Sequence, residues 1–173
     1  MTSASTSTVQ ETQVTQPSDQ KFLTFFLANE EYGLEILKVQ EIIGLMPITR
    51  VPRTPMFIRG VINLRGKVIS VVDLRLKFGM PEKEATSETC IIVVQAAGME
   101  MGIIVDKVSE VLAIATNEIE DAPSFGAEVN TDYILGIGKS QGKVKLLLDI
   151  DRVLSAQELV SLRSAIAENE REA

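Results

Sequence analysis

Apolar and polar residues alternate along most of this chain in short runs, a pattern typical of β-strands. Residues 22–27 and 32–36 form one pair of such runs, and the polar residues between them predict a hairpin. Residues 91–95 and 101–105 predict a second hairpin around Ala97-Gly98. The spacing therefore favours a strand-rich fold with tight connections.

The middle of the chain predicts two more strands and one short helical turn. Residues 61–63 and 67–72 are the strands, with Arg65-Gly66-Lys67 at the turn between them. Thr54-Pro55 has the form of a helix N-cap followed by proline in the first turn, and Gly60 would end that helix.

The clearest helix signal is near the C-terminus. Ser155 and Glu158 match a capping box, in which each side chain bonds the backbone N–H of the other residue. Leu159, Leu162 and Ile166 then fall on one helical face. We therefore expect a helix and tail over residues 153–173. Residues 1–20, which are rich in Ser, Thr and Gln, are expected to be a disordered tail.

An internal duplication organises the strands. Residues 24–42 align with 93–111, and residues 57–74 align with 133–150, in the same order along the chain. The aligned pairs include Gly33/Gly102, Gly60/Gly136, Gly66/Gly142 and Asp73/Asp149. We interpret this as two copies of one strand-rich unit, residues 21–85 and 86–152. The predicted fold is mainly β: two packed five-stranded β-barrels, with short helices and a C-terminal helix. Strand exchange between the copies stays open.

Composition narrows the chemistry that this fold could carry. The net charge of −7 disfavours binding to nucleic acid, and no apolar run is long enough to span a bilayer. With no signal-peptide pattern either, we expect a cytoplasmic protein without direct membrane insertion. The chain has no histidine and one cysteine, Cys90, within an apolar run. We expect Cys90 to be a buried thiol, and we expect no enzyme activity, cofactor or metal.

Two charged features leave alternatives open. Asp73 and Asp149 end equivalent strands, and we expect them to cap the chain that follows, although paired carboxylates could serve an enzyme or a small-ligand site. Between Arg50 and Lys77 there are seven basic residues and one acid. This zone could steer an acidic partner or could simply be a solvated surface.

Four segments resemble the signatures of the CheW-like domain family of bacterial chemotaxis adaptors. They are residues 31–42, 54–66, 71–75 and 106–112, and the resemblance extends from about residue 20 to residue 165. The resemblance implies two SH3-like barrels and a scaffold without enzymatic activity.

The resemblance also implies partners. One is the CheW-like regulatory domain of the histidine kinase CheA, and the other is the cytoplasmic tip of a methyl-accepting chemoreceptor. The protein would then lie at membrane-associated receptor arrays through these partners. A similar adaptor role in another receptor–kinase pathway, such as pilus-based motility, is the alternative.

The resemblance assigns the receptor-facing positions to Val39, Glu41 and Arg65, with Cys90 nearby. The full predicted partner-binding set is Val39, Glu41, Ile42, Arg59, Asn63, Arg65 and Cys90. Within it, we hypothesise that Glu41 and Arg65 form an ion pair that shapes the docking surface. Ile42 belongs to a group of aliphatic residues too large for a small barrel to bury, so some of them are expected to be an exposed anchor.

Overall fold

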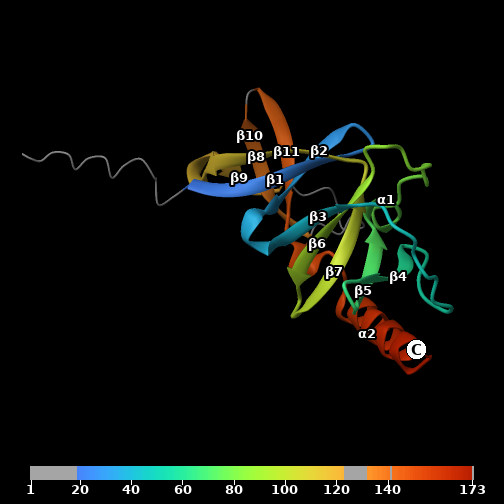
Figure 1. Ribbon diagram of the computed structural model, residues 1–173. Coiled ribbons are helices and arrows are strands. Elements are labelled where there is room, and N and C mark those ends of the chain that lie inside the picture. The colour runs from blue at the N-terminus through green and yellow to red at the C-terminus, as the bar shows by residue number, and fades with distance from the viewer. Residues whose placement is uncertain (1–18, 123–131, 141, 173) are drawn as a thin grey trace, which may run out of the picture.

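The computed structural model describes residues 19–122, 132–140 and 142–172, and its fold is mainly β (Figure 1). The strands are β1 (Asp19–Leu27), β2 (Glu30–Glu35), β3 (Val39–Gly44), β4 (Ile58–Leu64), β5 (Lys67–Asp73), β6 (Cys90–Ala96), β7 (Met99–Val105), β8 (Lys107–Ala115), β9 (Ile119–Glu120), β10 (Ile134–Ser140) and β11 (Lys143–Leu148). The helices are α1 (Leu74–Lys77) and α2 (Ala156–Glu172), with short 3₁₀ turns η2 (Ile36–Lys38), η3 (Thr116–Glu118) and η4 (Ile150–Arg152).

The predicted hairpins are present as β1–β2, β4–β5 and β6–β7. The first strand starts earlier than predicted, because Asp19 and Gln20 pair with Ala115 and Ile114 of β8. These two residues therefore belong to the sheet and not to a tail. The rest of the predicted tail, residues 1–18, lies outside the described residues.

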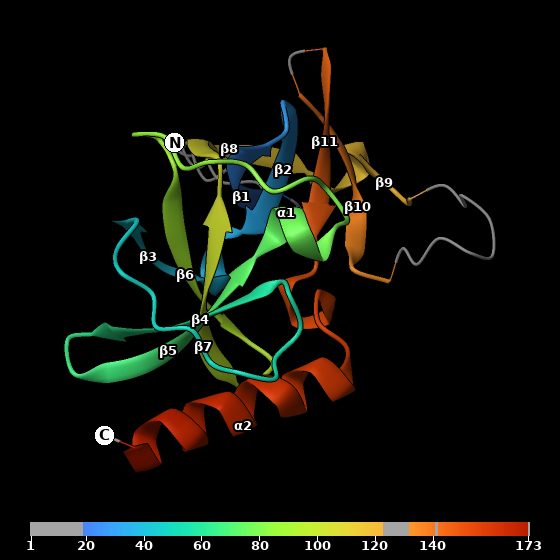
Figure 2. The same ribbon diagram turned by 90° about the vertical axis from the view of Figure 1, so that its right-hand side faces the viewer.

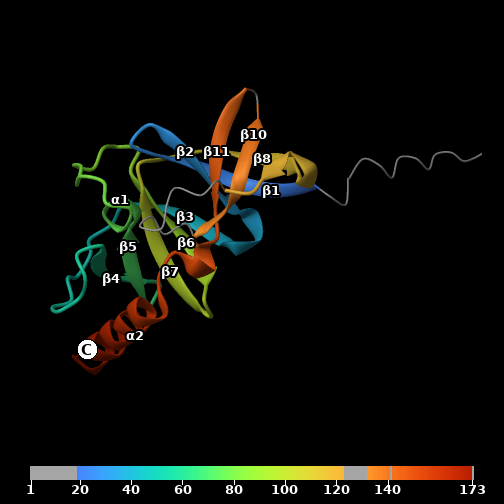
Figure 3. The ribbon, with the colours of Figure 1, turned by 180° about the vertical axis from the view of Figure 1, so that it is seen from behind.

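Two sheets form the molecule, and each combines strands from both copies. The six-stranded sheet has the order β8-β1-β2-β11-β10-β9, and the five-stranded sheet has the order β3-β6-β7-β5-β4. β2 pairs in parallel with β11, and β5 pairs in parallel with β7. In each of these two pairs, a strand of the first copy lies beside a strand of the second, so the copies exchange hairpins. Figures 1 and 3 show β10 and β11 beside β1 and β2, far from them in sequence. The division at residue 85 stays a prediction about the sequence repeat, since both sheets cross it.

One sheet has a strand more than the predicted five. The additional strand is β9, where Glu120 and Ile119 pair with Ile137 and Gly138 of β10. In the five-stranded sheet the corresponding contact is a single bridge between Thr49 and Val61. In each sheet, the segment that follows one edge strand therefore pairs with the strand at the other edge. The two sheets differ in the length of this pairing, which is two residue pairs at β9 and one bridge at Thr49.

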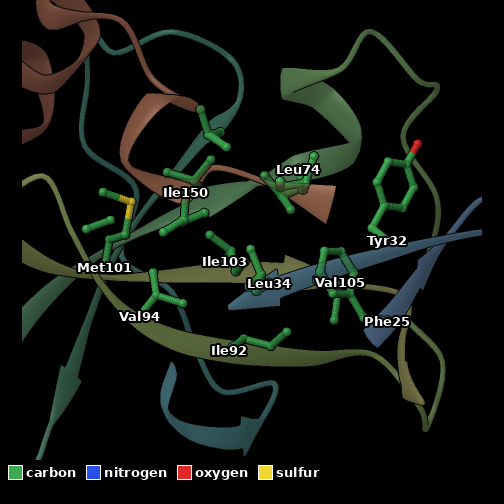
Figure 4. Packing of buried hydrophobic residues seen from close by; sticks show 14 of the residues in the cluster. Phe25, Tyr32, Leu34, Leu74, Ile92, Val94, Met101, Ile103, Val105 and Ile150 are labelled. Atoms are coloured by element: carbon green, nitrogen blue, oxygen red, sulfur yellow. The ribbon is translucent and has the colours of Figure 1, made fainter. Parts of the chain in front are cut away.

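The largest apolar cluster is built from both sheets. Phe25 and Leu34 come from the hairpin β1–β2, Ile92 and Ile103 from β6–β7, and all four are buried. Figure 4 shows these side chains converging, with Leu74 of α1 and Ile150 of η4 closing one side. Burying such side chains gives the main stabilisation of the fold, roughly 1.5–3 kcal/mol for each. Because this cluster spans the exchanged hairpins, neither copy has a complete core alone.

The predicted helical turn at residues 54–60 is wrong. The segment forms turns, and β4 already begins at Ile58. The Thr54 hydroxyl donates to the Val51 carbonyl instead of capping a helix, and Ile58 N–H donates to the Pro55 carbonyl. A segment of seven residues gains too few intrahelical hydrogen bonds to offset the cost of helix nucleation. Gly60 serves another purpose, because its φ of +140° and its closeness to the Thr49 carbonyl leave no room for a Cβ atom.

The C-terminal helix α2 is confirmed, together with its capping box. Ser155 N–H donates to the Glu158 carboxylate (2.7 Å), and Glu158 N–H donates to the Ser155 hydroxyl (3.1 Å). Leu162 on this helix is fully buried. Figure 2 shows α2 lying along the end of the five-stranded sheet, where it packs against β5 and β4. The helix thus covers the sheet that carries most of the predicted partner-binding residues.

Candidate partner-binding surface

The turn between β4 and β5 places Arg65 at the tip of a hairpin. Arg65 has a φ of +54° and Gly66 a φ of +86°, as a two-residue type I′ turn requires. The left-handed conformation costs a residue with a Cβ atom about 1 kcal/mol. The Asn63 carboxamide oxygen accepts a hydrogen bond from Gly66 N–H at 2.8 Å, which closes the turn.

Arg65 reaches from this tip to Glu41, so the predicted ion pair is present. Its two terminal nitrogens bond both carboxylate oxygens of Glu41, with Nη1 3.2 Å from Oε2 and Nη2 against Oε1. The hydrogen bonds lower the pKa of Glu41 and raise the pKa of Arg65. β3 and β4 are the two edges of the five-stranded sheet, and this pair bridges them on the surface.

Apolar side chains also occur on β3, the strand that carries Glu41, and in the turn that precedes it. Burial alternates along this strand, so that Val39 is half-buried against the main core while Ile42 is 45% exposed. Leu37, in the 3₁₀ turn that leads into β3, is 94% exposed. Glu41 and Ile42 pair with Val93 and Ile92 and so point to opposite faces of β3. The edge strand therefore carries a directional polar group on one face and an exposed aliphatic side chain on the other.

Arg59 and Cys90 lie away from the tip of the β4–β5 hairpin. Arg59 is at the opposite end of β4, where it pairs with Asp73 at 3.1 Å and Glu82 at 3.2 Å. Cys90 pairs with Gly44 at the far end of β3 and packs against the main core, and burial raises the pKa of its thiol. Five members of the predicted set therefore follow β3 and the β4–β5 hairpin tip: Val39, Glu41, Ile42, Asn63 and Arg65.

Two ion pairs that were not predicted from the sequence fix the segments leading into the edge strands β3 and β8. Lys38, immediately before β3, donates to Asp151 of η4 at 2.7 Å, and this bond raises the pKa of Lys38 and lowers that of Asp151. Arg75 of α1 makes two hydrogen bonds of 2.9 and 3.0 Å to Asp106, which precedes β8. Both pairs fix a linker that enters an edge strand.

The pKa of Asp106 reflects two opposed effects. Burial alone would raise it, but the hydrogen bonds from Arg75 and from Ala28 N–H (2.9 Å) leave it below its ordinary value. The carboxylate is therefore held charged in a largely buried position, which only a paired arrangement allows.

Asp73 and Asp149 cap the segments that follow their strands, as predicted. The Asp73 carboxylate accepts from Arg75 N–H (3.0 Å) and more weakly from Leu76 N–H (3.4 Å). Asp149 accepts from Asp151 N–H at 3.1 Å. Burial raises the pKa of Asp73. These bonds give both carboxylates structural partners in the chain itself.

Within the described ranges, no group of three or more histidine, cysteine, aspartate or glutamate side chains could hold a metal ion. A search of the same residues finds no helix with the length and apolar character needed to cross a membrane.

The basic zone between Arg50 and Lys77 is largely neutralised by pairing. Five of its seven basic residues, namely Arg59, Arg65, Lys67, Arg75 and Lys77, lie in ion pairs with carboxylates. Among the carboxylates in these pairs, only Asp73 lies between Arg50 and Lys77 in the sequence. The others lie outside this range, so the sequence of the zone did not reveal the pairing. Paired charges orient a partner at short range more than they attract it from a distance.

Two interleaved sheets, with charged and aliphatic side chains on the edge strand β3, form a small β module. The CheW-like domain model matches residues 21–158. The chain is 43% identical over 140 residues to the chemotaxis protein CheW of Klebsiella aerogenes, covering 81% of this chain and 84% of that protein. It is 37% identical over 139 residues to the chemotaxis protein CheW of Bacillus subtilis, covering 80% and 88%.

A solved structure agrees with these relatives. The scaffolding protein TtCheW from Thermoanaerobacter tengcongensis superposes with a TM-score of 0.74 at 37% identity, covering 80% of this chain and 94% of that one. The chain belongs to the CheW-like domain family. The relatives and this neighbour place it among chemotaxis adaptor and scaffold proteins.

Proposed function

We propose that this protein is a non-catalytic adaptor that joins a methyl-accepting chemoreceptor to the histidine kinase CheA. The observation that carries the proposal is the Glu41–Arg65 pair, which bridges the two edges of the five-stranded sheet at the edge strand that also carries the exposed Ile42. The family match and the relatives named as chemotaxis proteins support the pathway.

The receptor surface in this proposal consists of β3 and the β4–β5 hairpin tip. Val39, Glu41, Ile42 and Arg65 would contact the cytoplasmic tip of the receptor. Ile42 and Leu37 offer apolar area that is now in water, and their burial would drive association. The ion pair would fix orientation, since bidentate arginine–carboxylate pairs are directional. Arg59 and Cys90 would support this surface from the ends of β4 and β6.

The kinase would bind a different face of the molecule, through its own CheW-like regulatory domain. Simultaneous binding at two faces lets the receptor state bias the kinase without any chemistry in the adaptor. The adaptor would act in the cytoplasm, at membrane-associated receptor arrays. Rigid sheets suit this task, because a scaffold must hold two partners in one geometry.

The test is a pair of titrations with purified partners. In one, the chain is titrated with a soluble receptor cytoplasmic fragment, and in the other with the CheA regulatory domain. Reversing one charge of the pair in Arg65→Glu places two carboxylates against each other and should weaken receptor binding by about tenfold or more. Binding of the kinase domain should stay unchanged.

A matched control comes from the second copy. Lys139 pairs with Glu120 at 2.6 Å on the β10 strand, so Lys139→Glu reverses an equally exposed charge in the equivalent hairpin. This variant should bind the receptor fragment like the wild type. The receptor proposal is wrong if Arg65→Glu and wild type bind the fragment equally well. Tighter titration curves with a receptor fragment and a kinase domain from another pathway, such as pilus-based motility, would keep the adaptor mechanism and change the partners.

A further inference from the structure

Asn63 forms a bond within its own hairpin that bears on how Arg65 is held. Its side-chain oxygen accepts the Gly66 N–H across the turn at 2.8 Å, while Asn63 itself is exposed. Asparagine is suited to this role, because its short carboxamide can bond the backbone a few residues ahead. The amide is thus directed to the turn, although its position on the surface would equally allow a partner contact.

The turn that Asn63 closes is unfavourable for the residue at its tip. Arg65 adopts a left-handed φ of +54°, where glycine or asparagine is normally found. Nothing within the turn needs an arginine, since Gly66 already provides the other left-handed position. Its benefit lies in the guanidinium, which meets both oxygens of Glu41 on the opposite edge of the sheet.

The equivalent hairpin β10–β11 lacks this arrangement. Its Gly142 keeps the positive φ (+75°) of Gly66. Lys139 stands in place of Asn63, and its ammonium group reaches sideways to Glu120. A hairpin of this fold therefore forms without an asparagine at this position, and the asparagine occurs in the hairpin that must direct an arginine.

We infer that Asn63 is a positioning residue, which holds the β4–β5 turn in the shape that aims Arg65 at Glu41. It acts on the docking surface through Arg65 and not through contact with the partner. The consequence for receptor binding rests on the function proposed above, whereas the effect on the ion pair does not.

The experiment follows the Glu41 carboxyl by NMR titration in the full chain without any partner. In the wild type the pKa of Glu41 should lie below its ordinary value of 4.5, because of the hydrogen bonds from Arg65. Asn63→Ala removes the acceptor and should move that pKa toward 4.5. Asn63→Ser restores a weaker acceptor and should give an intermediate value. Lys139→Ala, the matched change in the other hairpin, should leave Glu41 as in the wild type.

Receptor binding provides the second readout. Asn63→Ala should weaken binding to the receptor fragment by about fivefold, and Asn63→Ser by less. In the background of Arg65→Ala, the Asn63→Ala change should have no further effect, because no guanidinium remains to be positioned.

The outcomes separate the inference from the proposed function. An unchanged Glu41 pKa in Asn63→Ala overturns the positioning role, whatever happens to binding. Weaker binding in Asn63→Ala within the Arg65→Ala background would show a direct contact by Asn63 and also overturn it. If the Glu41 pKa responds as expected and the wild-type chain does not bind the receptor fragment, the positioning role stands and the proposed function fails.

Discussion

The two linkers that enter the edge strands β3 and β8 are each held by an ion pair to a residue of the other copy. Arg75 and Asp151 occupy the same position in the two copies, two residues after the capping aspartate. Arg75 bonds Asp106 before β8, while Asp151 bonds Lys38 before β3. Both pairs join residues that belong to different copies. Arg75 and Asp151 carry opposite charges at one repeat position, whereas their partners differ in position, because Asp106 aligns with Leu37 and Lys38 with Lys107.

The comparison teaches which positions the fold requires. Glycines that permit close backbone approach and aspartates that cap the strands are the same in both copies, at Gly60/Gly136 and Asp73/Asp149. Interior and surface chemistry have diverged, as where Ile69 in one copy corresponds to the buried Lys145 in the other. The backbone framework is therefore shared, and the residues proposed above to bind the receptor include Arg65, which one copy alone carries.

The largest expected effect comes from the shared glycines. Gly60→Ala should destabilise the protein by about 4 kcal/mol, because the position combines a φ of +140° with a clash against the Thr49 carbonyl. Gly136→Ala should cost about 2 kcal/mol, since its new Cβ atom would lie 2.7 Å from the movable Ile119 methyl group and 3.0 Å from the Glu120 carbonyl. Urea unfolding measures both. Equal costs would contradict the stricter constraint on the first copy.

The buried lysine provides the next comparison. Lys145 is 2% exposed and pairs with Glu31 at 3.3 Å, across the parallel strands β11 and β2. Lys145→Met should destabilise the protein by about 3 kcal/mol, because Glu31 is left charged and without this partner. Adding Glu31→Gln should recover most of that loss in urea unfolding. Lys67→Met, which breaks the mainly exposed pair with Glu100, should cost below about 1 kcal/mol. A double variant as unstable as Lys145→Met would show that the damage comes from packing.

The linker pairs predict a smaller stability effect than Gly60 and Lys145 do, and it depends on pH. The folded pKa of Asp106 lies below its ordinary value of 3.8, so its charge stabilises the fold above that value. That stabilisation is lost as the pH falls through the folded pKa. Asp106→Asn should cost about 2 kcal/mol at pH 7, and wild type and variant should converge once the pH has fallen below the lowered folded pKa of Asp106. The more exposed Asp151 should show the same direction with a smaller difference. A difference that stays constant down to pH 2 would contradict this account.

Local patterns predicted the hairpins β1–β2, β4–β5 and β6–β7 and the capping box of α2, because alternation, turn residues and caps are properties of neighbouring positions. The capping aspartates were predicted from their equivalent places in the two copies, whereas β3 and β8 were given no range of their own. The duplication predicted that the copies depend on each other. It left strand exchange open, because alternation shows which face of a strand is buried and does not identify the neighbouring strand.

The candidate site was predicted unevenly for the same reason. The Glu41–Arg65 pair came from a resemblance that includes both residues. The bonds of Arg59 to Glu82 and of Arg75 to Asp106 depend on the sheet arrangement, so charge patterns along the chain did not reveal them. The hydrogen bond of Asn63 to Gly66 N–H joins residues three positions apart. A polar residue at this distance from a glycine is compatible with many roles, so the bond could be identified only in the structure.

The central claim is that one chain joins receptor and kinase through separate surfaces. The most direct measurement is co-sedimentation of CheA with receptor-containing membrane vesicles, with the adaptor absent, present, or carrying Arg65→Glu. The account predicts that the adaptor increases the amount of sedimented kinase, and that Arg65→Glu removes this increase while still binding CheA in solution. The account is contradicted if the kinase sediments equally with and without the adaptor, or if Arg65→Glu recruits it as well as the wild type.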